Sequence, residues 1–91
     1  MIVPAQIRAA RSLLGLRQLQ LSKLADLGIT TVKRIELSEG PSGSVRTLLK
    51  IQSALERAGV EFIPADETKG PGVRLKHTGK AKPKKAAKRG T

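Results

Sequence analysis

The stretch Leu14–Glu36, LGLRQLQLSKLADLGITTVKRIE, decides the fold of this chain. Apolar residues recur in it at steps of three and four, which is the spacing of one face of an α-helix. Leu21, Leu24 and Ala25 are spaced in this way, so the pattern predicts a first helix over residues 18–25 with these three side chains on its buried face.

A second short helix is predicted over residues 29–37, with Val32 and Ile35 on its buried face. The three residues 26–28, Asp-Leu-Gly, leave room only for a turn between the two helices, and Gly28 is suited to a positive φ or to capping the helix that follows. Two helices joined by so short a turn are typical of a helix-turn-helix, in which the second helix presents its polar side to DNA.

At these residues the chain resembles the Xre, or lambda-repressor-like, family of helix-turn-helix regulators. The resemblance covers about residues 5–58 and requires no gap. The positions that match the family pattern are Leu14, Gly15, Leu16, Gln18, Leu21, Ala25, Leu27, Thr31, Val32, Ile35 and Glu36.

Four positions depart from that pattern. Asp26 replaces the usual turn glycine, and aspartate tolerates the left-handed conformation better than most residues. Ser22 replaces an alanine and is still small enough for close helix packing. Gly28 replaces a capping serine, and Arg17 stands where a serine or threonine usually caps the first helix. We expect the motif to form despite these changes.

The outward side of helix 29–37 is the predicted reading surface. Lys and Arg donate to guanine O6 and N7 in the major groove, while Thr and Ile contact the thymine methyl group. The pattern leaves open which side chain meets a base and which a phosphate, and the alternative is an ordinary solvated helix face. The residues expected at DNA here are Gly28, Ile29, Thr30, Lys33 and Arg34.

Contacts to the phosphate backbone are expected on either side of this helix. Gln18 opens the first helix of the motif, where the free N–H groups of a helix N-terminus favour an anion, and the resemblance also implies a DNA contact at this glutamine. Such contacts position the protein without reading sequence. The other candidate clamps are Arg17, Ser42, Ser44 and Arg46.

The flanking sequence predicts two more helices and a hairpin. Pro4 suits the first turn of a helix over 4–14, ended by Gly15, and Ser44 suits the N-cap of a helix from Val45 to Ala58, ended by Gly59. Between them, residues 38–44 are a loop by composition. Beyond Gly59, residues 60–63 and 73–76 alternate in polarity and predict a hairpin that leans on the preceding helix or on a second copy.

The charge of the chain points to a polyanionic partner. The formal net charge is +11, and residues 76–91 carry seven basic side chains and no acidic one. Residues 77–91 also lack any apolar side chain larger than alanine, so we expect a disordered tail that contacts DNA phosphates or acts as a solubilising end. Phe62 is the only aromatic residue, which argues against binding single strands by base stacking and favours a duplex.

Little in the sequence is suited to catalysis, metal binding or membrane insertion. There is no cysteine, no apolar run of membrane-spanning length and no secretory signal, so we expect a cytoplasmic, nucleoid-associated protein without cofactor or metal. Glu36 is expected to pair with a basic side chain such as Arg11, or to accept hydrogen bonds from N–H groups of the loop, rather than act as a catalytic acid. His77, the only histidine, lacks the companions of a metal site.

The expected fold is mainly α, a lambda-repressor-like domain of four to five helices over residues 1–59, with a hairpin over 60–76 and a tail over 77–91. The expected function is sequence-specific binding of double-stranded DNA by a homodimeric repressor, with the hairpin at the dimer interface. Two other functions stay open: an antitoxin-type module that binds a toxin or other protein partner and regulates its own gene, and a nonspecific nucleoid-type protein. An enzyme is the least favoured reading.

Overall fold

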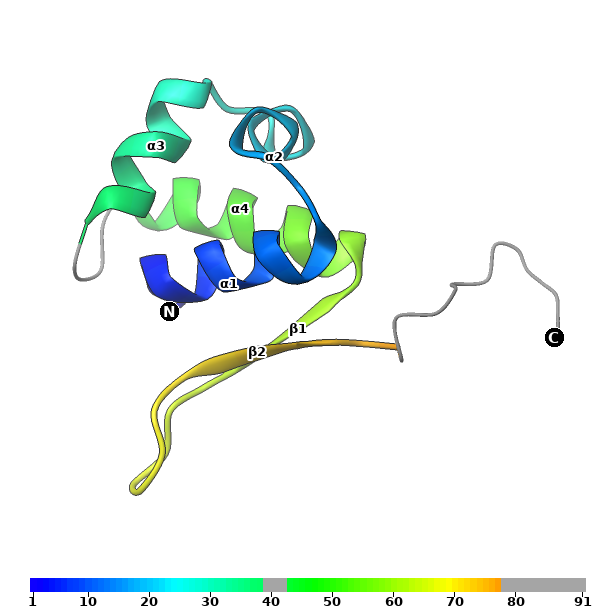
Figure 1. Ribbon diagram of the computed structural model, residues 1–91. Helices are drawn as coiled ribbons and strands as arrows, with labels where there is room; N and C mark the ends of the chain where they lie inside the picture. Colours follow the sequence, from blue (N-terminus) through cyan, green and yellow to red (C-terminus); the bar gives the residue numbers. More distant parts are fainter. Residues whose placement is uncertain (39–42, 78–91) are drawn as a thin grey trace, which may run out of the picture.

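The computed structural model describes residues 1–38 and 43–77, which form a mainly helical domain with a two-stranded antiparallel hairpin after the helices (Figure 1). The elements in chain order are α1 (Pro4–Leu14), α2 (Gln18–Ala25), α3 (Ile29–Leu37), α4 (Val45–Ala58), β1 (Val60–Ile63) and β2 (Gly72–Leu75). The four predicted helices are confirmed to the residue, and the second strand begins and ends one residue earlier than predicted. The predicted clamp Ser42 and the predicted disordered tail after His77 lie outside the described residues.

The ends of α1 and α2 follow the same local geometry. Gly15 adopts a left-handed conformation with φ 71°, and the N–H groups of Gly15 and Leu16 bond back to the carbonyls of Ser12 and Arg11 at 3.2 and 2.9 Å. This is the Schellman arrangement, which satisfies carbonyls that the end of a helix leaves open. It turns the chain sharply, so that α2 begins only four residues after α1 ends.

Asp26 makes the equivalent turn at the end of α2. Its φ of 59° is the only positive φ of a non-glycine residue in the described chain. The Asp26 N–H bonds to the Lys23 carbonyl at 3.2 Å, and the Leu27 N–H bonds to the Ser22 carbonyl at 2.8 Å. The prediction that aspartate replaces glycine in this turn is therefore confirmed.

Because an L-residue is strained in this conformation, Asp26→Gly is expected to raise the free energy of unfolding by about 0.5–1 kcal/mol. Urea denaturation followed by circular dichroism measures the change. Lys23→Gly is the matched control, since Lys23 is exposed within right-handed α2 and its replacement is expected to cost about 1 kcal/mol. If both substitutions changed the free energy of unfolding in the same direction, the strain assigned to Asp26 would be contradicted.

The core lies where α1 and α4 pass beneath the α2–α3 pair (Figure 1). It is aliphatic, and its largest fully buried side chains are Ile7, Leu21, Val32, Ile51, Leu55 and Val60. The predicted burial of Leu24 is wrong. Leu24 is 48% exposed, because α2 packs on α3 and α4 through Leu21, Ser22 and Ala25.

The hairpin packs against the helices through one face. Val60 pairs with Leu75 and Phe62 with Val73, and these four side chains lie on or in the core. The predicted support from α4 is confirmed, but α1 supports the hairpin as well. Gln6 provides this contact: it is buried, and its amide donates to the carbonyls of Ile63 and Gly72 at 3.3 and 2.8 Å.

Gln6 is a buried contact that the sequence analysis did not identify. Its carbonyl oxygen also accepts from the Val3 N–H at 2.9 Å, so one side chain caps α1 and holds the hairpin. No helix of the described chain is long and apolar enough to cross a membrane.

Candidate nucleic-acid interface

The outward side of α3 is exposed, as the sequence predicted. Val32 and Ile35 hold the helix to the core, with 0% and 3% of their surfaces exposed. On the other side Thr30, Lys33 and Arg34 are exposed, and Ile29 is half-buried at the start of the helix. Neither Lys33 nor Arg34 forms an ion pair with another described residue, so both cations are available to a ligand.

The N-terminus of α3 carries no side-chain cap. Gly28 is exposed with φ −74° and ψ 151°, and its carbonyl accepts from the N–H groups of Thr31 and Val32 at 3.1 and 3.3 Å. Among the described residues, none apart from its two chain neighbours comes within 4 Å of the position that a Cβ of Gly28 would occupy. An anion therefore has open access to this positive end of the helix.

The N-terminus of α2 lies beside α3 and holds Arg17 and Gln18. Arg17 is exposed, and its N–H donates to the Gln20 side-chain oxygen at 2.8 Å, which is one half of a capping box. Gln18 is half-buried, and its amide nitrogen donates to Glu36 Oε1 at 3.1 Å. The predicted phosphate contact of Gln18 thus competes with a partner inside the protein, and it stays a prediction.

Glu36 joins three helices through one carboxylate. It is 4% exposed at the end of α3, and Arg11 of α1 donates to both of its oxygens, from Nε to Oε2 and from Nη2 to Oε1, each at 2.8 Å. Gln18 of α2 completes the set. The predicted pairing of Glu36 with Arg11 is confirmed. A bidentate pair of this kind fixes the orientation of both side chains.

Arg11 remains charged in this setting. The hydrogen bond to Glu36 raises the pKa of the Arg11 guanidinium above its ordinary value, and the negative charge of Glu36 adds to the effect, whereas burial opposes it. Arg11 also donates from Nη1 to the Leu16 carbonyl at 3.0 Å, which ties the α1–α2 turn to the same cluster. The ion pair with Glu36 and the hydrogen bond to the Leu16 carbonyl, both made by the charged Arg11, therefore hold the α2–α3 motif against α1.

Arg8 is a member of this cluster that the sequence analysis did not identify. Its Nη1 donates to the main-chain carbonyl of Glu36, near the C-terminal end of α3, where a cation is favourable. Arg8 lies three residues before Arg11, so both project from one side of α1. That spacing was the available signal, but it did not indicate which helix the two arginines would meet.

The start of α4 holds two further candidates. The Ser44 hydroxyl accepts from the Thr47 N–H at 3.1 Å and donates to Thr47 Oγ1 at 2.9 Å, which confirms it as the N-cap of α4. Arg46 is exposed in the first turn of the same helix. The capping role occupies the Ser44 side chain, so Arg46 is the stronger of these two candidates for a phosphate contact.

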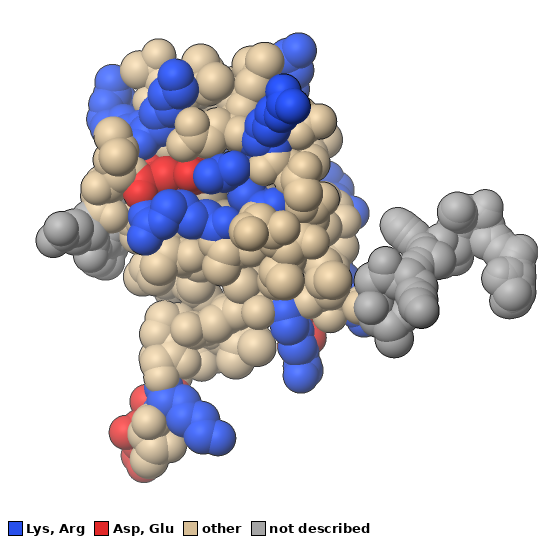
Figure 2. Space-filling view, in the orientation of Figure 1, with Lys and Arg blue, Asp and Glu red and all other residues tan. Residues whose placement is uncertain are grey.

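Charge is distributed unevenly over the surface. On the face shown in Figure 2, most Lys and Arg side chains gather over the helical end of the molecule, around one acidic patch, whereas the tip of the hairpin carries acidic and basic atoms side by side. The helical end is thus the electropositive one. The described residues contain no cluster of three or more His, Cys, Asp or Glu side chains arranged to hold a metal ion.

Comparison with protein-family models finds no match, and no curated protein matches the chain either.

Proposed function

We propose that this protein is a sequence-specific, double-stranded-DNA-binding transcriptional regulator of the Xre, lambda-repressor-like type. In this proposal α3 enters the major groove, α2 lies across the DNA backbone, and Arg17, Gln18 and Arg46 contact phosphates. Repression follows from occupancy of the operator.

One observation carries the proposal. A short helix, α3, is fixed to the core by Val32 and Ile35, follows α2 after a tight left-handed turn at Asp26, and leaves Thr30, Lys33 and Arg34 exposed and without intramolecular ion pairs to described residues. These exposed groups are the donors and methyl contacts that read base edges. The excess of basic side chains around them supports attraction to a duplex.

Selection from a pool of randomised duplexes with the purified full chain tests the proposal. We expect a preferred duplex to emerge and to bind at least about 1,000-fold more tightly than unrelated DNA at physiological salt. Equal affinity for unrelated duplexes would instead support the nucleoid-type alternative, and no binding to any duplex would leave only a protein partner.

We propose that the regulator acts as a homodimer, because one short helix contacts too few base pairs for high specificity and a dimer reads two half-sites about 34 Å apart. The hairpin is the proposed interface. Its two strands form a sheet of their own, so each strand pairs on one side only, and Ile63 is 36% exposed beside it. A second hairpin would extend the sheet and cover this side chain.

Ile63→Glu is therefore expected to convert a dimer into a monomer at tens of micromolar, because it places a charge in an apolar contact. Sedimentation velocity measures the change. Leu19→Glu is the matched control: Leu19 is 48% exposed on α2, which packs mainly on α3 and α4, and its replacement should leave the dimer intact. A monomer of the unmodified chain, both free and on DNA, would remove the dimer from the proposal.

The basic tail is expected to contribute affinity but no sequence preference. Deleting residues 77–91 removes Lys80, Lys82, Lys84, Lys85, Lys88 and Arg89. The expected result is a shallower dependence of log K on log salt concentration, by up to about 0.9 for each DNA phosphate that the tail neutralises, with the same preferred duplex. Fluorescence anisotropy across a salt series measures the slope, and an altered preferred sequence would contradict the prediction.

A further inference from the structure

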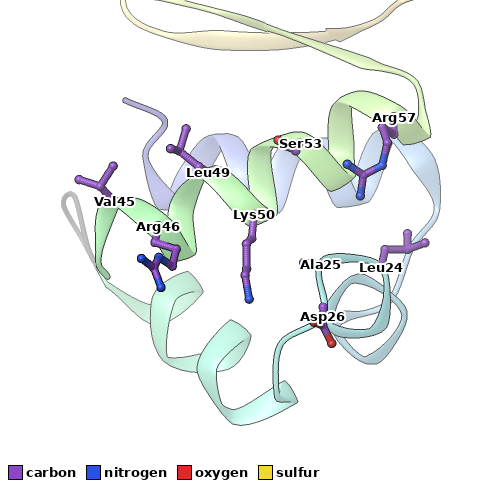
Figure 3. Close-up of a pocket in the computed structure, with 9 residues that line it drawn as sticks. All are labelled: Leu24, Ala25, Asp26, Val45, Arg46, Leu49, Lys50, Ser53 and Arg57. Carbon is purple, nitrogen blue, oxygen red and sulfur yellow. The ribbon is translucent and has the colours of Figure 1, made fainter.

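A shallow groove runs between α2 and α4 on a part of the surface that the proposed DNA contacts leave largely unused. We name it the α2–α4 groove. It is lined by the apolar side chains Leu24, Val45 and Leu49 and by the basic side chains Arg46, Lys50 and Arg57. Figure 3 shows Arg46 and Lys50 pointing from α4 toward α3 and α2, Val45 and Leu49 on the side of α4 that faces away from α2, and Leu24 on α2 near Arg57.

The apolar side chains of this groove are unusually exposed for their size. Leu24, Val45 and Leu49 have 48%, 58% and 50% of their surfaces exposed. Single exposed apolar residues are ordinary, but three that line one groove between two elements are typical of a binding surface. This grouping also explains why Leu24 fits the helical pattern of α2 without joining the core.

The part of α4 that lines the groove is as long as a short helix. Val45 and Leu49 are four residues apart, as are Arg46 and Lys50, and Arg57 continues the same side of α4 two turns later. From residue 45 to residue 57 the rise of α4 is about 18 Å, or a little over three helical turns. An amphipathic helix of that length lies in such a groove through residues at i, i+3, i+4 and i+7.

The charges that line the groove indicate which kind of partner would bind there. None of Arg46, Lys50 and Arg57 forms an ion pair with another described residue, and Asp26 is the one acidic residue that lines the groove. A second copy placed symmetrically on this face would bring like charges together. A duplex would satisfy the cations but gain little from the three apolar side chains. A partner helix with carboxylates beside an apolar stripe satisfies both.

We propose that the α2–α4 groove binds an acidic amphipathic helix of a partner protein. The apolar stripe of that helix packs on Leu24, Val45 and Leu49, and its carboxylates pair with Arg46, Lys50 and Arg57. This assignment does not depend on DNA binding. Thr30, Lys33 and Arg34 of α3 lie outside the groove, so a bound partner leaves the proposed reading surface open, and Arg46 is the residue that both surfaces share.

The test uses a synthetic peptide of about 15 residues, with Leu at i, i+3, i+4 and i+7 and Glu at the outward positions. The control peptide has the same composition with its leucines spread around the helix. Each is titrated into the ¹⁵N-labelled full chain and followed by NMR. We expect the amphipathic peptide alone to shift the amides of the groove, and Lys50→Glu or Leu49→Ser to weaken its binding roughly tenfold or more.

Lys69→Glu is the matched control variant, because it makes the same change of charge at the exposed tip of the hairpin and should leave the affinity unchanged. Circular dichroism confirms that each variant is folded. Equal binding of the two peptides, or an equal loss in Lys69→Glu, would overturn the proposal in favour of nonspecific charge attraction. Weaker binding of an unrelated duplex in Leu49→Ser, or self-association abolished by Lys50→Glu, would overturn it in favour of DNA or a second copy.

Discussion

Arg11→Met is expected to lower the free energy of unfolding by about 3–5 kcal/mol, a large part of the total stability of a domain of this size. Methionine keeps most of the aliphatic volume of arginine but removes the charge. The Glu36 carboxylate, with 3% of its side chain exposed, then keeps only the Gln18 amide as a side-chain partner. An uncompensated buried charge of this kind is far more costly than an apolar contact in its place. Urea denaturation of the full chain measures the loss.

The double variant Arg11→Met/Glu36→Met separates charge from packing. Replacing both members of a buried ion pair by apolar residues of similar volume is often neutral or stabilising. We therefore expect the double variant to be more stable than Arg11→Met alone, although it has one more substitution. A double variant that is less stable than the single one would show that the hydrogen bonds of Glu36, rather than its unpaired charge, set the loss.

Lys33→Ala/Arg34→Ala is expected to weaken binding to the selected duplex by about 2–4 kcal/mol, roughly 30- to 1,000-fold in Kd. The same variant should weaken binding to unrelated duplexes much less, because it removes only two charges from a strongly basic chain. Both side chains are exposed on α3 and neither forms an ion pair with a described residue, so the fold should tolerate their removal. Competition binding with both duplexes measures the two effects together.

Lys50→Ala/Arg57→Ala is the charge-matched control for this prediction. It removes the same number of positive charges from the exposed side of α4, where neither side chain forms an ion pair with a described residue. Only nonspecific affinity should change, and only slightly. If the two double variants weakened both duplexes equally, the side chains of α3 would act through charge alone, and the proposed reading of bases would fail.

The helices were predictable because their signals are local. Gly15, Gly28, Ser44 and Gly59 mark helix ends through the conformation or capping ability of a single residue, and each stands at a helix end in the structure. The pairing of Glu36 with Arg11 was also predictable, since a lone carboxylate at the end of a short basic helix needs a cation. The tolerance of Asp26 for a left-handed conformation follows from its side chain alone.

What could not be predicted depends on contacts between residues far apart in the chain. Gln6 reads as a surface residue until the hairpin carbonyls of Ile63 and Gly72, 57 and 66 positions away, are placed beside it. Leu24 has the correct period for burial, but the direction from which α4 approaches α2 leaves it exposed. The partner of Gln18 depends in the same way on the position of Glu36.

The same distinction between local signals and contacts of distant residues applies to the candidate site. Periodicity alone placed Thr30, Lys33 and Arg34 on the outward side of α3, and their exposure is confirmed. The α2–α4 groove could not be predicted, because it needs the relative placement of two helices that are not adjacent in the chain.

The attachment of three helices to the single carboxylate of Glu36 has a thermodynamic consequence for recognition. A reading helix that is already rigid loses little conformational entropy when it docks, so complex formation would not require folding of α1, α2 or α3. The heat-capacity change of association would then reflect the surface that becomes buried rather than an ordering of these helices. The preference for one duplex over another would then depend on a few side chains at fixed positions and on how easily each DNA sequence deforms to fit them.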